Sequence, residues 1–114
     1  MKFETFEDIL AWQKSEILAV NVYNKLRNCR DFGFKDQLQR AVVSIGSNIA
    51  EGFERKSNKE FKQFLFIAKG SCAEVRSLLR LAFKLNYFTS LDFNSLHSLS
   101  LEISKMLSGL IKTL

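Results

Sequence analysis

The sequence predicts an all-α protein, an antiparallel four-helix bundle with up-down-up-down topology, and three observations lead to this prediction. The chain contains no proline, the residue that most often breaks helices. Apolar residues recur at spacings of three and four along four segments, as they do on one face of an α-helix. No alternating apolar and polar run lies between turn dipeptides, so strands are not expected. With 114 residues, we expect a single domain over residues 1–114 whose short links favour antiparallel neighbours.

The first helix is expected over residues 7–28. Thr5 and Asp8 have the spacing of an N-cap and an acidic third helical residue. The apolar residues between Ile9 and Leu26 go most of the way around this helix, so they need cover on more than one side. Part of this surface, including Trp12, is therefore predicted to form a subunit interface.

The second helix is expected over residues 34–51, where apolar residues form one stripe and polar residues form another beside it. Asp31 is the expected cap, and Gly33 is expected in the connection. Gly52 is well placed to end the helix, because glycine readily adopts the backbone conformation that follows a helix.

The last two helices are expected over residues 57–86 and 92–112. Ser57 and Glu60 have the spacing of a capping box, which makes the start of the third helix the clearest of the four. Leucine and isoleucine residues at spacings of three and four define the core face of the fourth helix.

The net charge of +5 comes from one part of the chain. Residues 1–52 hold seven basic and seven acidic side chains, and residues 87–114 hold two of each. Residues 53–86 hold eight basic and three acidic side chains. The whole excess of positive charge is therefore expected on the third helix and the connection before it.

Six of these cations are spaced so that they fall on one face of the third helix, within an arc of about 100°. Together with the two cations before the helix they form what we call the basic stripe: Arg55, Lys56, Lys59, Lys62, Lys69, Arg76, Arg80 and Lys84. Like charges at i, i+4 repel each other, so a stripe without interspersed glutamates favours an anionic partner, usually phosphate. The alternative is an ordinary solvated face that happens to be cationic. Phe66 lies inside the arc, where an aromatic ring can stack on a base but more often contacts another subunit.

Several function classes find little support. His97 is the only histidine, and no spacing of histidines or cysteines is typical of a metal site, so neither metal nor cofactor is expected. No nucleophile–base pair or phosphate-binding glycine loop is visible, so the protein is not expected to be an enzyme. Two cysteines without a disulfide framework, no signal peptide and no membrane-spanning run predict a cytoplasmic protein that does not bind membranes.

Glycines inside helices need a reason, because each costs about 1 kcal/mol there. Gly46 and Gly70 are expected to allow close approach of two helices. Polar side chains near them are expected to hydrogen-bond across that contact, and we group the residues of this structural motif as Ser44, Asn48, Glu51, Gly52, Gly70 and Ser71.

The stretch from Ser44 to Arg55, with Ser57, Glu60 and the later Gly70-Ser71, resembles a known family. It is similar to the four-helix-bundle proteins encoded in intervening sequences of bacterial 23S rRNA genes, also called S23 ribosomal protein-like. The resemblance covers nearly the whole chain and implies a homopentamer of four-helix protomers. The family also includes accessory proteins of diversity-generating retroelements, which bind nucleic acid and a reverse transcriptase.

Two functions follow as hypotheses. The first is a non-enzymatic homo-oligomer, a pentamer by resemblance, that contacts the phosphates of RNA or of an RNA–DNA hybrid through the basic stripe. The second is a protein–protein adaptor, such as an accessory subunit of a retroelement reverse transcriptase, whose basic stripe meets an acidic protein surface.

Overall fold

The computed structural model describes residues 3–114 and contains four long helices. Met1 and Lys2 lie outside the described residues. The expectation that the N-terminal segment is no signal peptide includes these two residues. A short 3-10 turn precedes the first helix, and no strand occurs between residues 3 and 114. The elements are η1 (Phe6–Asp8), α1 (Leu10–Lys25), α2 (Phe32–Phe53), α3 (Asn58–Lys84) and α4 (Ser90–Lys112).

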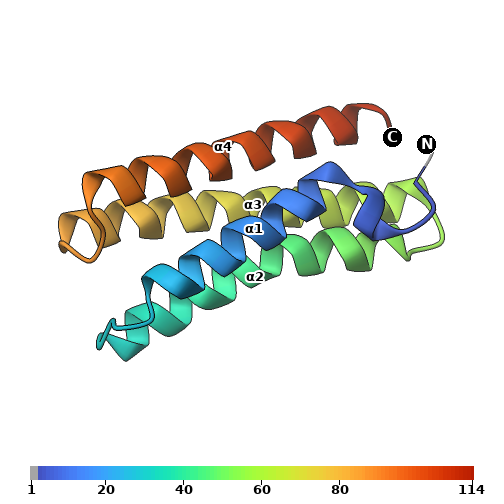
Figure 1. Ribbon diagram of the computed structural model, residues 1–114. Coiled ribbons are helices and arrows are strands. Elements are labelled where there is room, and N and C mark those ends of the chain that lie inside the picture. The colour runs from blue at the N-terminus through green and yellow to red at the C-terminus, as the bar shows by residue number, and fades with distance from the viewer. Residues whose placement is uncertain (1–2) are drawn as a thin grey trace.

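The helices run alternately up and down along a rod of 43 × 22 × 19 Å (Figure 1). Two ion pairs mark the antiparallel pairing of α1 with α4. Lys14, near the start of α1, pairs with Glu102 in the second half of α4 at 2.9 Å. Lys25, at the end of α1, pairs with Asp92 in the first turn of α4 at 3.1 Å. The predicted all-α four-helix bundle is therefore confirmed.

One apolar core runs the length of the rod between the four helices. Each helix contributes large side chains that are fully buried, among them Leu18, Leu38, Ile45, Ile49, Leu65, Leu79, Ile103 and Leu107. Cys72 belongs to this core, and its burial raises the pKa of the thiol to about 11. Removing this apolar surface from water is the main contribution to the stability of the bundle.

Local capping signals give two of the helix starts. The hydroxyl of Ser57 accepts the backbone N–H of Glu60 at 3.2 Å, as the sequence predicts for α3. The carboxylate of Asp31 accepts the backbone N–H of Phe34 at 3.2 Å, so the predicted cap of α2 is also confirmed. These bonds satisfy amide groups that lack a partner inside the helix.

Four of the predicted boundaries are wrong near the first two helices. The first helix ends at Lys25, three residues before the predicted end, because the chain passes into turns bonded from Arg27 to Asn24 and from Cys29 to Leu26. The predicted pairing of Thr5 with Asp8 is present, since Asp8 accepts the backbone N–H of Thr5 at 3.1 Å, but it caps the 3-10 turn. The helix α1 begins only at Leu10, because Ile9 has extended backbone and is buried in the core. Gly33 lies inside α2, which begins one residue earlier, at Phe32. Gly52 also lies inside α2 rather than after it, because its missing side chain is needed for packing, as described below.

The third helix ends at Lys84 in a C-cap motif built on Asn86. Asn86 has a φ of 64°, the left-handed conformation that asparagine tolerates better than most residues. The N–H of Tyr87 then donates to the carbonyl of Ala82 at 2.8 Å, and that of Asn86 donates to Phe83 at 3.1 Å. The helix α4 begins at Ser90 instead of near Asp92, because the hydroxyl of Thr89 caps it by accepting the backbone N–H of Asp92 at 3.1 Å.

Candidate nucleic-acid interface

The basic stripe lies along α3 and the connection that precedes it. Five of its cations are exposed: Arg55, Lys56, Lys59, Arg80 and Lys84. The other three, Lys62, Lys69 and Arg76, are half-buried and lie between these two exposed groups. The free charges are thus concentrated toward the two ends of α3.

Carboxylates of the same protomer leave most of the stripe uncompensated. Between residues 3 and 114, Arg55 is the one stripe residue with an ion-pair partner, Glu51, at 3.5 Å. The guanidinium of Arg55 also lies 4.8 Å from the centroid of the Phe64 ring, a cation–π contact. Glu74 is the acidic residue in the second half of α3, about 200° around the helix from Arg76. The exposed cations without an ion-pair partner, Lys56, Lys59, Arg80 and Lys84, are therefore available to an anion from outside.

Two half-buried cations of α3, Lys69 and Arg76, are partly withdrawn from solvent. The ammonium of Lys69 donates to the hydroxyl of Ser108 at 2.7 Å. Nη1 of Arg76 is buried and has no hydrogen-bond partner in the described part of the chain. The hydroxyl of Ser100 donates to the carbonyl of Cys72 in the same region at 3.4 Å. Lys69 thus makes a polar contact between α3 and α4, which the angular spacing of the stripe could not reveal.

Phe66 is 55% exposed on the outer side of α3, among the cations. Three other large apolar side chains of α3 are also exposed: Ile67, Leu81 and Leu85. Gly70 lies on the same helix, and a Cβ atom placed there would meet nothing within 4 Å. The prediction that Gly70 permits a close helix contact is therefore wrong within the protomer.

The other motif residues join α2 to its neighbours. The hydroxyl of Ser44 donates to that of Ser71 at 2.7 Å, which links α2 to α3 as expected. The side-chain amide of Asn48 instead donates to the carbonyl of Ser44 at 2.7 Å, within its own helix. A Cβ atom on Gly52 would lie only 2.5 Å from Cβ of Phe64, so this glycine allows α2 and α3 to touch.

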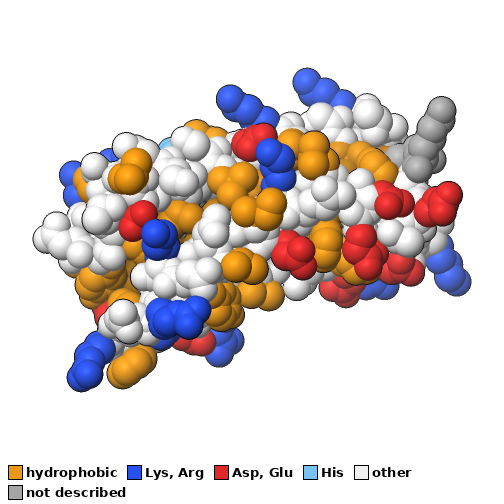
Figure 2. Space-filling model, in the orientation of Figure 1, with side chains coloured by type: hydrophobic (Ala, Val, Ile, Leu, Met, Phe, Trp, Pro, Cys, Tyr) orange, Lys and Arg blue, Asp and Glu red, His pale blue; other side chains and the backbone are white. Residues whose placement is uncertain are grey.

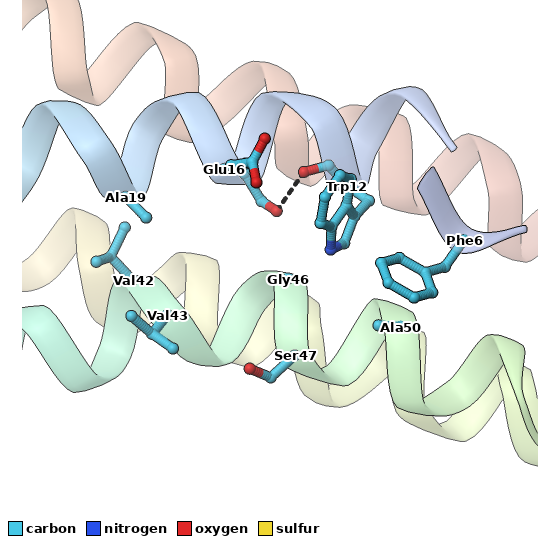
Figure 3. Close-up of a pocket in the computed structure, with 10 residues that line it drawn as sticks. Phe6, Trp12, Glu16, Ala19, Val42, Val43, Gly46, Ser47 and Ala50 are labelled. Carbon is cyan, nitrogen blue, oxygen red and sulfur yellow. Dashed lines mark hydrogen bonds between the residues drawn. The ribbon is translucent and has the colours of Figure 1, made fainter. Parts of the chain in front are cut away.

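Gly46 has the same role on the side of α2 that faces α1. A Cβ atom there would lie 2.8 Å from Oγ of Ser15 and 3.4 Å from Nε1 of Trp12. The predicted close approach at Gly46 is confirmed, and Figure 3 shows the Trp12 ring directed toward it.

Trp12 forms one wall of an open groove of about 280 Å³ between α1 and α2 (Figure 3). The indole packs edge-to-face on Phe6, with ring centroids 5.0 Å apart. Most other lining residues are small or apolar, including Ala19, Val42 and Val43. The hydroxyl of Ser15 donates a hydrogen bond to the carbonyl of Trp12 at 2.7 Å. The side chain of Glu16 points away from α2 in Figure 3. Converging polar groups, which a small-molecule site requires, are thus absent from this groove among the residues described.

A second group of cations, which the sequence analysis missed, surrounds the turn between α1 and α2. Four cations lie within residues 25–35, namely Lys25, Arg27, Arg30 and Lys35, with Asp31 as the one acidic residue among them. Figure 2 shows Lys and Arg side chains at this end of the rod and many carboxylates near the opposite end. A charge count over shorter windows would have revealed this group, because the acidic residues that balance it precede residue 17 or follow residue 35.

The described residues offer little for catalysis. The ring of His97 lies 5.1 Å from that of Phe93, and no hydrogen bond joins it to Cys29 or Cys72 within residues 3–114. No group of three His, Cys, Asp or Glu side chains that could hold a metal ion occurs in the described region. None of the helices traced from residue 3 onward combines the length and apolar character needed to span a bilayer.

Comparison with known proteins gives two matches. The family model of the 23S rRNA-intervening sequence protein matches residues 7–109. A crystal structure of a protein with unknown function from the S23 ribosomal protein family, from Bacteroides thetaiotaomicron VPI-5482, superposes with a TM-score of 0.85 at 31% identity. The match covers 90% of this chain and 99% of that chain. No curated protein matches. Neither description names an enzymatic activity, and both agree with the resemblance seen in the sequence.

Proposed function

Since this chain belongs to the family of 23S rRNA-intervening sequence proteins, we propose that it is a non-enzymatic homo-oligomer that binds RNA through the basic stripe. The observation that carries the proposal is the absence of compensating carboxylates for most of the stripe in residues 3–114. Like charges held along one rigid helix repel each other, and phosphates would relieve that repulsion.

The dimensions of the stripe suit a duplex. From Lys59 to Lys84 the rise of an α-helix gives a length of about 37 Å, long enough to lie along a stretch of duplex. Exposed cations at both ends, Lys56 and Lys59 at one and Arg80 and Lys84 at the other, could contact phosphates on successive crossings of the backbone. Such contacts give affinity with little sequence preference.

Salt dependence tests this proposal directly. If about five exposed cations each neutralise a phosphate, affinity for an RNA duplex should fall by about 10²- to 10³-fold between 50 and 200 mM salt, because the bound phosphates release their counterions. Fluorescence anisotropy with a labelled duplex measures this slope. An affinity that does not change over this range would contradict the proposal.

Self-association would repeat the stripe by symmetry and add avidity. The outer face of α1 supports a subunit interface there, because four large apolar side chains on it are 44–54% exposed: Leu10, Ile17, Val20 and Tyr23. Trp12 lies on the same helix in the open groove, and Phe66 offers a further apolar contact on α3.

A charged residue on this face should separate the subunits. The wild-type protein is expected to sediment as five protomers of 13.1 kDa, and Val20→Glu as a monomer, because burying a single carboxylate without a partner is costly. Sedimentation velocity measures the mass. Leu91→Glu is the control, since Leu91 is 77% exposed and lies at the start of α4. A monomeric wild type, or a Val20→Glu protein of unchanged mass, would refute this interface.

The adaptor function remains the alternative, and one observation favours it. Phe66, Ile67, Leu81 and Leu85 expose apolar surface beside the cations, a mixture typical of protein interfaces. A stable complex with an acidic protein partner, together with an RNA affinity that does not change with salt concentration, would favour the adaptor over RNA binding.

A further inference from the structure

The turn between α1 and α2 carries three cations that no carboxylate compensates. Lys25 is paired with Asp92, but Arg27, Arg30 and Lys35 have no ion-pair partner among residues 3–114. The guanidinium of Arg27 donates to the side-chain oxygen of Asn24 at 2.8 Å, and Lys35 reaches only the backbone carbonyl of Arg27 at 3.5 Å. Arg27 and Arg30 are exposed, and Lys35 is half-buried beside them.

Asp31 lies among these cations but forms no ion pair with them, because its two oxygens are directed at other donors. Oδ1 accepts the N–H of Phe34 at 3.2 Å, and Oδ2 accepts the hydroxyl of Tyr87 at 2.6 Å. The bond from Tyr87, and to a smaller degree that from Phe34, lowers the pKa of Asp31. The carboxylate thus holds the α1–α2 turn against the α3–α4 turn, and neither arginine pairs with it.

The surface around these cations is hollow and carries an exposed aromatic ring. Two open pockets of about 340 and 510 Å³ share Asn28, Cys29 and Arg30, and the larger is also lined by Arg27, Phe32 and Lys35. Phe32 is 70% exposed at the first position of α2, a helix that holds its backbone in place. A free aromatic face among unpaired cations fits a nucleotide, whose base stacks on the ring and whose phosphates meet the arginines.

We propose that this end of the bundle binds an unpaired strand of nucleic acid, with a base stacked on Phe32 and phosphates held by Arg27 and Arg30. The proposal rests on the proposed RNA-binding function and adds a second site to it. The bond between Tyr87 and Asp31 places the α1–α2 turn at the end of the rod where the basic stripe finishes with Lys84. A duplex bound along α3 would therefore present its single-stranded extension to Phe32.

Two RNA ligands test the site: a blunt duplex, and the same duplex with a single-stranded uridine extension. The wild type should bind the extended duplex more tightly. Phe32→Ala should remove about a tenfold advantage for the extended duplex and leave affinity for the blunt one unchanged, because only the stacked base is lost. Phe32→Trp should keep the advantage and Phe32→Leu should lose it, since stacking needs a ring and not merely apolar volume.

Control variants distinguish binding at this site from nonspecific attraction to charge and from binding by the basic stripe. Leu91→Ala removes another strongly exposed apolar side chain and should change neither affinity. Arg27→Gln with Arg30→Gln should lower affinity for the extended duplex more than for the blunt one. Equal affinity of the wild type for both ligands, or an advantage that survives Phe32→Ala, would overturn the inference while leaving the basic stripe untouched.

A uridine oligonucleotide without any duplex distinguishes the two proposals. The wild type can fail to bind duplex RNA and still bind the oligonucleotide. If Phe32→Ala then abolishes binding of the oligonucleotide, the site at the turn is supported and the duplex-binding proposal is refuted. If the oligonucleotide does not bind the wild type at all, the site is refuted, whatever the duplex does.

Discussion

A protein in which four exposed cations of the basic stripe are replaced by glutamine should bind an RNA duplex at least about 100-fold more weakly at 100 mM salt. The replaced residues are Lys56, Lys59, Arg80 and Lys84, all of which are exposed and have no ion-pair partner within residues 3–114. Each lost phosphate contact should also lower the salt slope by about one, so the slope should fall by about four. Anisotropy titrations at several salt concentrations measure both quantities.

The fold should survive these replacements, because glutamine favours helices nearly as well as lysine and arginine do. A charge-matched pair of variants separates position from net charge. Arg80→Gln with Lys84→Gln removes two cations from the stripe, and Lys105→Gln with Lys112→Gln removes two exposed cations from α4. If both pairs weaken binding equally, net charge and not the stripe determines affinity.

Replacing Gly52 by alanine should destabilise the bundle, although alanine is the better helix former by about 1 kcal/mol. The added Cβ would lie 2.5 Å from Cβ of Phe64 and 3.1 Å from Cδ1 of Phe61. Cβ of Phe64 is fixed to the backbone of α3, so the two helices must move apart. Overpacking of this kind costs about 1–3 kcal/mol, which outweighs the gain in propensity.

Gly70 and Gly109 provide matched controls, since each lies inside a helix with nothing within 4 Å of an added Cβ. Gly70→Ala and Gly109→Ala should each raise the free energy of unfolding by about 0.5–1 kcal/mol. Urea unfolding followed by circular dichroism at 222 nm measures all three variants. A Gly52→Ala protein as stable as the controls would contradict the close contact between α2 and α3.

The existence and order of the helices could be predicted because their signals are local. Ser57 and Asp31 cap α3 and α2 through bonds to residues three positions later, a distance that the sequence displays. The boundaries near Ile9 and Gly52 depend instead on other elements. Ile9 is held extended by burial in the core, and Gly52 is kept small by Phe64 of a different helix.

The candidate sites show the same division. Helical spacing placed six cations of the stripe on one arc of the third helix, but could not show that Lys69 reaches Ser108 of α4 or that Arg76 is half-buried. The group around Phe32 was hidden for a different reason. When charges are summed over residues 1–52, the acidic residues before residue 17 cancel the positive charge of this group. In space, however, the length of α1 separates the acidic residues from the cations.

The path of the chain also governs how quickly a protomer forms. Each helix packs on the one that follows it in sequence, and bundles with such local contacts fold in microseconds to milliseconds. The chain has no proline, so no slow isomerisation of a prolyl bond delays it. A ribosome adds about 5–20 residues per second, much more slowly than that. Each protomer should therefore be folded almost as soon as α4 leaves the ribosome, and encounter between protomers would then limit the rate of assembly.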